Sequence, residues 1–160
     1  MTIAELDKED ESHVATRLLE CCGSSEWVTR MLAARPFRNV TNLEAIATET
    51  WWKLSPTDWL EAFSKHPKIG EKSKVSQWSA EEQSGMNSAV AETAAKLAEL
   101  NRLYFDKFGW IFIVCATGKS ADEMLSLLEQ RLPNHSEEEL RIAAAEQSKI
   151  MLLRLRRLLT

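Results

Sequence analysis

A helix-start pattern recurs along this chain of 160 residues and favours a mainly helical fold. In a capping box, a serine or threonine hydroxyl and a glutamate three residues later accept hydrogen bonds from backbone N–H groups that the first helical turn leaves without partners. The spacing occurs at Thr2–Glu5, Thr41–Glu44, Ser79–Glu82, Ser120–Glu123 and Ser136–Glu139. The run Ser55-Pro56-Thr57-Asp58 adds another predicted start, with proline at the first helical position.

Apolar residues between these starts recur at helical spacing. The stripes are Val14, Leu18 and Cys22; Leu43, Ala47 and Trp51; Trp59, Leu60 and Phe63; and a long one that runs through Met86, Val90, Ala94, Leu97, Leu100 and Tyr104. Gly109 predicts the end of the long helix. The last helix is expected from about Glu137 to Leu159. We therefore predict an all-α fold, a compact single-domain bundle of several helices.

One segment departs from helical spacing. The run from Trp110 to Cys115 is apolar on both faces and rich in β-branched and aromatic residues, which indicates an extended conformation. No second segment suits a partner strand, and a lone strand leaves its backbone groups unpaired. We expect a buried extended connector whose unpaired N–H and C=O groups can bind a polar ligand. The alternative is that the segment is only core, paired locally or by water.

Composition narrows the classes of function. The net charge of −4 argues against a general phosphate-binding surface, and hence against a nucleic-acid partner. Three cysteines, two of them adjacent at Cys21 and Cys22, form neither a disulfide framework nor a zinc spacing, so a cytoplasmic location is expected. The acidic start does not resemble a signal peptide, and the apolar run from 110 to 116 is too short to span a membrane. One domain over residues 1–160 is expected, because no linker divides the chain.

A titratable residue occupies a stiff corner at His66-Pro67-Lys68-Ile69-Gly70. Proline disfavours a helical backbone at His66, and Gly70 permits a turn. An imidazole titrates near pH ~6.5, so His66 can donate or accept a proton at neutral pH. A lone histidine is more often structural than catalytic, although the restriction by Pro67 raises the chance of a catalytic role.

For several other polar residues, the spacing alone favours a structural role over a catalytic one. Glu82 completes the Ser79 capping box, and Gln83 suits an exposed helical position. Cys115 lies in an apolar run, which indicates a buried and inert thiol. Arg154 sits within an apolar stripe, so its guanidinium either reaches water or meets an anion. No metal-ligand spacing, phosphate loop or dinucleotide fingerprint is present in the sequence.

A set of motifs runs along nearly the whole chain: Trp27; Arg35-Pro36-Phe37; His66-Pro67-Lys68-Ile69-Gly70; Ser79, Glu82 and Gln83; Lys107-Phe108-Gly109; Phe112-Ile113-Val114-Cys115-Ala116; Arg131-Leu132; and Ile150 with Arg154-Leu155. In identity and order these motifs resemble those of the OHCU decarboxylase family of purine degradation, where OHCU is 2-oxo-4-hydroxy-4-carboxy-5-ureidoimidazoline. Three residues depart from the family pattern: Trp110-Ile111 replaces the Phe-Pro of many members, and Thr117 replaces an arginine that is frequent there.

The resemblance implies an all-α homodimer that decarboxylates OHCU to S-allantoin and carbon dioxide without a cofactor or a metal. His66 and Glu82 would be the catalytic residues. The substrate would be bound by Pro67, Ser79, Gln83, Arg154 and the backbone of Val114, Cys115, Ala116, Thr117 and Gly118.

Two other classes of function stay open from the sequence. The first is a non-catalytic helical module that uses the same pocket for a ureide or a protein partner. The second is a cofactor-free hydrolase that acts on a related ring. The joint presence of His66 and Glu82 favours the decarboxylase over the binding module.

Overall fold

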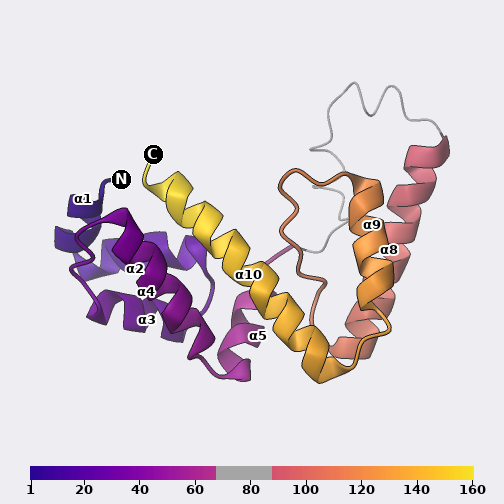
Figure 1. Ribbon diagram of the computed structural model, residues 1–160, viewed down its shortest axis with the longest axis horizontal. Helices are drawn as coiled ribbons and strands as arrows, with labels where there is room; N and C mark the ends of the chain where they lie inside the picture. The colour runs from indigo at the N-terminus through magenta and orange to yellow at the C-terminus, as the bar shows by residue number, and fades with distance from the viewer. Residues whose placement is uncertain (68–87) are drawn as a thin grey trace. The chain divides into compact units, whose positions relative to one another are not determined.

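Residues 1–67 and 88–160 are described by a computed structural model (Figure 1). The predicted capping box at Ser79 and Glu82, together with Gln83, lies outside these residues. Within the described ranges the chain forms helices and no strand, which confirms the all-α prediction. The helices are α1 (Ile3–Lys8), α2 (Glu11–Cys21), α3 (Ser25–Ala33), α4 (Val40–Trp52), α5 (Pro56–Ser64), α8 (Ser88–Phe108), α9 (Ala121–Arg131) and α10 (Ser136–Leu158).

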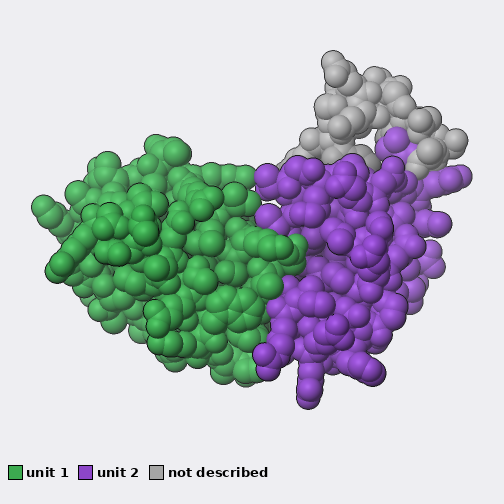
Figure 2. Space-filling view, viewed as in Figure 1, with its two compact units in different colours: residues 1–65, 144–160 green, residues 66–143 purple. Residues whose placement is uncertain are grey.

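The chain divides into two compact units, which Figure 2 shows in green and purple. The first unit comprises Met1–Lys65 and Ala144–Thr160, and the second comprises His66–Ala143. The division falls inside α10, so this helix contributes residues to both. The expectation of one domain over residues 1–160 stays a prediction.

Buried tryptophans organise the first unit. The indole N–H of Trp27 donates to the backbone oxygen of Ala47 at 3.1 Å, and that of Trp51 donates to Ala144 at 2.9 Å. Trp59 in turn donates to the backbone oxygen of Trp51 at 2.9 Å. A buried indole N–H needs an acceptor, and here each ring finds one on a different segment. The rings therefore join α3, α4, α5 and α10 through polar as well as apolar contacts.

The Arg35-Pro36-Phe37 motif has a structural role in the first unit. The Arg35 Nη1 atom donates to the backbone oxygens of Leu6 and Glu9 at 3.0 and 2.9 Å, at the end of α1. The Asp7 carboxylate accepts from the backbone N–H of Phe37 at 2.6 Å. A cation stabilises the last carbonyls of a helix, so this motif ties the turn after α3 to the end of α1.

The core of the second unit lies between α8, α9 and the connector that joins them. Its buried members are Leu97, Tyr104, Phe108, Phe112, Val114 and Leu128. The Tyr104 ring centroid lies 4.6 Å from that of Phe108 and 5.3 Å from that of Phe112. These contacts pack the start of the connector against the end of α8, as aromatic pairs at this separation do.

Three predicted helix starts are confirmed. Thr2 and Glu5 form a reciprocal capping box, with N–H to oxygen distances of 2.7 and 3.1 Å. Ser55 begins α5, with Pro56 in the first turn. The Ser120 hydroxyl accepts from the backbone N–H of Glu123 at 3.1 Å, at the start of α9.

Two predicted capping boxes are wrong. Helix α4 begins after Asn39, whose side chain accepts from the backbone N–H of Asn42 at 2.8 Å, so Thr41 lies inside the first turn. Asparagine is among the best residues for this position, and it precedes the threonine. Helix α10 begins at Ser136, but the Glu139 carboxylate is fully buried and accepts from Arg131 instead of capping the helix.

The predicted apolar stripes are largely buried. Leu43, Ala47 and Trp51 are fully buried along α4, and Leu97 and Tyr104 are buried along α8. The prediction that Leu60 shares the buried face of α5 is wrong. Leu60 is 39% exposed, because the face of α5 turned to the core carries Trp59, Ala62 and Phe63.

The remaining boundaries agree closely with the sequence. Gly109 ends α8 with a backbone φ of 86°, a conformation that glycine adopts without steric cost. Helix α10 covers Ser136–Leu158, within one residue of the expected bounds at each end. Among the helices of the described residues, none is long and apolar enough to cross a membrane.

Candidate active site

His66 directly follows the end of α5. Lys65 caps this helix, and its backbone N–H donates to the backbone oxygen of Ala62 at 3.2 Å. His66 is half-buried and Pro67 is exposed. The helix therefore ends just before the histidine, as the following proline predicted. The catalytic role of His66 stays a prediction.

The loop between α2 and α3 passes close to Lys65, the residue before His66. Gly23, in the loop between α2 and α3, is buried. A Cβ atom at Gly23 would lie 2.4 Å from the Cγ atom and 2.9 Å from the Cβ atom of Lys65. Such distances leave no room for a side chain, so the loop can pass the end of α5 because residue 23 is glycine.

The predicted substrate-binding backbone lies on one connector, between α8 and α9. Val114 and Cys115 are buried, whereas Ala116, Thr117 and Gly118 are exposed. Gly118 adopts a φ of 76°, and the Lys119 N–H donates to the backbone oxygen of Ala116 at 3.0 Å. The connector is thus extended and buried at first, as predicted, and then reaches the surface through a turn.

Several carbonyls of the connector have partners, so the expectation that its C=O groups are unpaired is wrong for these positions. The backbone oxygen of Ile113 accepts from Arg131 Nη1 at 2.7 Å. The backbone oxygen of Cys115 accepts from Lys119 Nζ at 2.8 Å. Side chains here supply the hydrogen bonds that a neighbouring strand would otherwise provide.

A buried polar cluster behind the connector was not predicted from the sequence. The Glu139 carboxylate accepts from Arg131 Nε at 2.8 Å, from Arg131 Nη2 at 2.5 Å and from the Tyr104 hydroxyl at 2.5 Å. The side chain of Arg131 is 8% exposed and that of Glu139 is 0% exposed. Burial, and then the hydrogen bond to Glu139, raise the pKa of Tyr104 well above its ordinary value.

A signal for this cluster exists in the sequence. Tyr104 is the one tyrosine of the chain, and it falls within a helical stripe that otherwise carries aliphatic residues. A buried tyrosine hydroxyl requires a hydrogen-bond partner. Because the spacing of Ser136 and Glu139 suggested a capping box, Glu139 was not considered as the partner of the Tyr104 hydroxyl.

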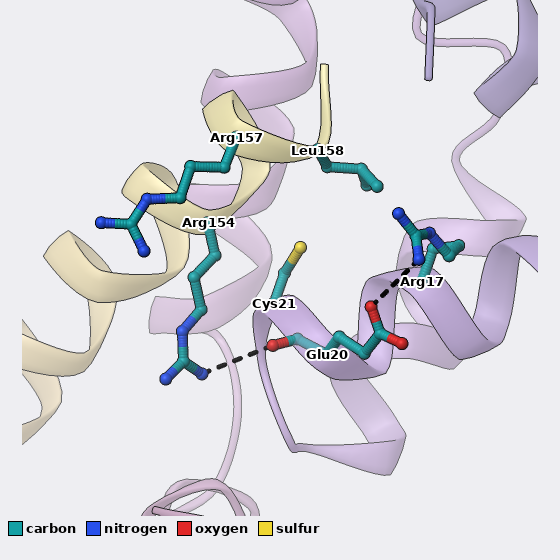
Figure 3. A pocket seen from close by; sticks show the side chains of 6 residues that line it. All are labelled: Arg17, Glu20, Cys21, Arg154, Arg157 and Leu158. Atoms are coloured by element: carbon teal, nitrogen blue, oxygen red, sulfur yellow. Dashed lines mark hydrogen bonds and ion pairs between the residues drawn. The ribbon is translucent and has the colours of Figure 1, made fainter. Parts of the chain in front are cut away.

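A hollow beside Arg154 is the other polar feature of the first unit (Figure 3). It has a volume of about 300 Å³ and lies between α2 and α10. Arg154 Nη1 donates to the backbone oxygen of Glu20 at 3.4 Å, near the end of α2. Arg17 pairs with the Glu20 carboxylate at 3.4 Å. The lining residues are Arg17, Glu20, Cys21, Arg154, Arg157 and Leu158.

The charge of this hollow favours an anion. Three arginines and one glutamate line it, and Arg17 pairs with that glutamate. Burial raises the pKa of Cys21 to about 11, with a smaller opposing effect of Arg154, so the thiol is uncharged at neutral pH. Arg154 is half-buried, and its guanidinium is directed to the backbone oxygen of Glu20 (Figure 3). Contact of Arg154 with an anion stays a prediction.

The predicted site residues thus fall into separate groups. Val114 to Gly118 share one connector in the second unit, while Arg154 lies in the first unit. His66 and Pro67 follow α5. Ser79, Glu82 and Gln83 lie outside the described residues, so their roles stay predictions. Within residues 1–67 and 88–160, no group of three or more histidine, cysteine, aspartate or glutamate side chains is arranged to hold a metal ion.

The helical fold defines an all-α protein with polar groups at a helix end, on a connector and beside Arg154. A family model described as OHCU decarboxylase matches residues 7–156 of this chain. The chain belongs to the OHCU decarboxylase family.

Individual relatives agree with this assignment. The chain is 45% identical over 148 residues to the uric acid degradation bifunctional protein TTL of Arabidopsis thaliana. This alignment covers 86% of this chain and 45% of that protein. It is 27% identical over 161 residues to 2-oxo-4-hydroxy-4-carboxy-5-ureidoimidazoline decarboxylase of Halalkalicoccus jeotgali, with 99% of this chain and 92% of that protein covered. The chain spans less than half of two bifunctional relatives, 45% of the Arabidopsis protein and 32% of one from Bacillus sp. (strain TB-90).

A solved structure has the same fold. It is a crystal structure of OHCU decarboxylase in the presence of (S)-allantoin, with 37% sequence identity and a TM-score of 0.77. The similarity covers 94% of this chain and 99% of that one.

Proposed function

We propose that this chain decarboxylates OHCU to S-allantoin and carbon dioxide in urate degradation, as a cofactor-independent carboxy-lyase. The observation that carries the proposal is the match of almost the whole chain, at 37% identity, to a solved OHCU decarboxylase. The relative from Halalkalicoccus jeotgali bears the name of this activity and is covered over 92% of its length.

The substrate can supply its own electron sink. Loss of carbon dioxide from the carboxylate leaves an electron pair on the ring carbon, and the adjacent C=N bond accepts it. A C=C bond forms, and the nitrogen of the former C=N bond takes up one proton. The hydroxyl proton then leaves as a carbonyl forms, and the carbon that bears the ureido group takes up a proton on one face, so that one proton is consumed overall. Most decarboxylases obtain such a sink from a cofactor, whereas this reaction needs only orientation and proton transfer from the protein.

We assign His66 and Glu82 to the proton transfers. In general, a carboxylate titrates at acidic pH and an imidazole near neutral pH, so the two groups suit general acid and base roles. The position of His66 after α5, restricted by Pro67, supports its part in this assignment. Ser79 and Gln83 would bind the urea-like parts of the substrate, to which hydroxyl and amide groups can both donate and accept.

We assign Arg154 to the substrate carboxylate. Arg154 lines a hollow of about 300 Å³, and Arg17 and Arg157 line it as well and add positive charge. A guanidinium binds a carboxylate through two parallel hydrogen bonds, which fixes the orientation of the leaving carboxyl group. The backbone from Val114 to Gly118 would contact the polar atoms of the ring.

A homodimer in the cytosol is part of the same proposal. Residues 21, 22 and 115 carry buried thiols without disulfides, which suits a reducing compartment. Phe105 of α8 is 40% exposed and is a candidate for a subunit interface. Of the five tryptophans in the described residues, three are buried and add little apolar surface to such an interface. Light scattering at micromolar concentration tests the dimer, and a monomer would refute this part alone.

Product chirality provides the test of the activity. Freshly prepared OHCU decays spontaneously to racemic allantoin, so an excess of S-allantoin formed with one carbon dioxide per substrate supports the proposal. The decay is followed by circular dichroism and absorbance, with trapping of carbon dioxide. Racemic allantoin formed at the spontaneous rate refutes the proposed activity. If the chain then still binds the substrate tightly, the non-catalytic module is favoured. A ring-opened product without carbon dioxide would favour the hydrolase.

A further inference from the structure

We propose that Arg131, Glu139 and Lys119 are positioning residues that orient the backbone amides of the connector toward the substrate. This inference rests on the proposed function, because it assumes that the backbone from Val114 to Gly118 contacts OHCU. It goes further by naming the side chains that set the direction of those amides. All of the groups involved lie in the second unit.

The first step is the geometry around Glu139. This carboxylate accepts from both Nε and Nη2 of Arg131, and also from the Tyr104 hydroxyl at 2.5 Å and from Asn134 Nδ2 at 3.1 Å. Its donors come from α8, from α9 and from the turn before α10. Both Arg131 bonds end on one oxygen, Oε2, which also accepts from Tyr104, and they hold the Nε–Nη2 edge of the guanidinium against Glu139.

The second step is the contact from Arg131 to the connector. Its remaining terminal nitrogen, Nη1, donates to the backbone oxygen of Ile113 at 2.7 Å. Its guanidinium carbon lies 4.4 Å from the centroid of the Phe112 ring. Arg131 therefore contacts two successive residues of the connector, one by a hydrogen bond and one by a cation–π contact.

The third step follows from the planarity of the peptide unit. The carbonyl of one residue and the N–H of the next lie in one plane and point in opposite directions. The bond from Arg131 to the Ile113 carbonyl thus sets the direction of the Val114 N–H. The bond from Lys119 Nζ to the Cys115 carbonyl, at 2.8 Å, sets the direction of the Ala116 N–H in the same way.

The turn at the end of the connector extends this argument by one residue. The Lys119 N–H donates to the Ala116 carbonyl at 3.0 Å, which orients the Thr117 N–H. Ala116 and Thr117 are exposed, so their amides belong to the part of the connector that a ligand can reach. Amides held in advance at the site of developing charge stabilise a transition state without reorganisation during the reaction.

Stability alone is a poor explanation for the buried pair of Arg131 and Glu139. The desolvation of two charges offsets most of their attraction, and apolar side chains of similar volume often replace such a pair without loss. Apolar replacements would fill the space but would leave the Ile113 carbonyl without its donor. The directional bond to the connector is what the charged pair adds.

The lysines of the second unit provide a matched test. Lys119→Met removes the donor to the Cys115 carbonyl. Lys107→Met is the control, because Lys107 Nζ also donates to backbone carbonyls, those of Leu132 and Asn134, at 2.6 and 3.0 Å. We expect Lys119→Met to lower kcat by roughly 10- to 100-fold, with little change in KM, and Lys119→Arg to restore part of the loss. Lys107→Met should stay within about twofold of the unchanged enzyme, since such a carbonyl contact away from the connector affects stability alone.

The buried pair is tested with a double variant, because a single substitution would leave an unpaired buried charge. Arg131→Met with Glu139→Leu removes both charges and the donor to Ile113. We expect a folded protein by circular dichroism, with faster amide hydrogen exchange at Val114 and lower kcat. Equal losses of kcat in the Lys119→Met and Lys107→Met variants would overturn the inference. Unchanged amide exchange at Val114 in the double variant, or at Ala116 in Lys119→Met, would overturn it as well.

Amide exchange also separates this inference from the proposed function. If the unchanged protein makes no excess of S-allantoin, the proposed function fails. Faster exchange in the variants would then still support the orientation of the connector by Arg131 and Lys119, while unchanged exchange would overturn it.

Discussion

Arg156 pairs with Glu44 through two hydrogen bonds, from Nε to Oε1 at 2.9 Å and from Nη2 to Oε2 at 3.2 Å. Hydrogen bonding to Arg156 lowers the pKa of Glu44 below its ordinary value. Arg157, the next residue, instead lines the hollow beside Arg154. Adjacent arginines on one helix therefore serve different purposes, because residues one apart lie on different faces.

The three arginines should differ when each is replaced by glutamine. Arg154→Gln should lower kcat/KM strongly, by about 10²-fold, because it removes a bidentate bond to the substrate carboxylate. Arg157→Gln should raise KM several-fold through the loss of a nearby positive charge, and added salt should reduce this difference. Steady-state kinetics at two salt concentrations measures both effects.

Arg156→Gln serves as the control for these variants. Arg156 is exposed and solvent screens its pair with Glu44, so its loss should change the unfolding free energy little and leave the kinetics unchanged. Similar turnover in all three variants would show that Arg154 has no special role.

His66→Ala should fold with near-native stability and lose most of its turnover. His66 follows the end of α5 and belongs to no helix, so its loss should leave the helices formed, whereas a positioned acid or base contributes about 10²- to 10⁴-fold in rate. Melting temperature and the enantiomeric excess of allantoin are the measurements. Full activity in this variant would contradict the proposed mechanism.

Glu82 should show two separable effects. Glu82→Gln keeps a side chain that can complete a capping box, so it should retain stability and lose the carboxylate chemistry. Glu82→Ala should lose both, at a cost of roughly 0.5–2 kcal/mol. If Glu82→Gln forms S-allantoin at the unchanged rate, this residue is a helix cap and His66 alone carries the catalytic assignment.

Gly23→Ala should destabilise the first unit by about 1–3 kcal/mol, the range for an overpacked site. The new methyl group would lie 2.4 Å from the Lys65 Cγ atom, so the end of α5 must shift. Because Lys65 directly precedes His66, turnover should fall as well. Adding Lys65→Gly should recover part of both losses. Urea unfolding and allantoin production measure them, and no loss in Gly23→Ala would contradict the close approach.

Tyr104 should make stability fall at high pH. Its pKa is raised in the folded state, while in the unfolded chain a tyrosine ionises near pH ~10. The unfolded chain then binds fewer protons than the folded protein, so stability is fully present below pH ~10 and declines as the pH rises above it. Because Tyr104 is the one tyrosine, tyrosinate absorbance reports it alone.

Tyr104→Phe is the variant for this prediction. It removes one donor to Glu139 and the acceptor of the Trp110 indole N–H at 3.0 Å, which should cost about 1–3 kcal/mol near neutral pH. The decline in stability between pH ~10 and 11 should become shallower than in the unchanged protein. The burial of Cys21 and Cys22 raises their pKa values to about 11 and 12, so some decline should persist. A tyrosinate titration near pH ~10 in the folded protein would contradict the prediction.

The sequence by itself determined most helices, because their signals act over a few residues. The starts at Thr2, Ser55 and Ser120 and the end at Gly109 all depend on hydrogen bonds or dihedral angles within one turn. Helix α4 is capped by Asn39 instead of Thr41, and this cap too is a hydrogen bond within the first turn.

The tertiary structure decided which polar side chains meet. Glu139 has the spacing of a capping residue, yet it binds Arg131 and Tyr104, which come from two other helices. Arg156 and Arg157 are identical in type, but their neighbours on α4 and α2 assign one to an ion pair and the other to a hollow. Local spacing carries no information about a partner brought near by packing, and burial is what gives such a partner its energetic weight.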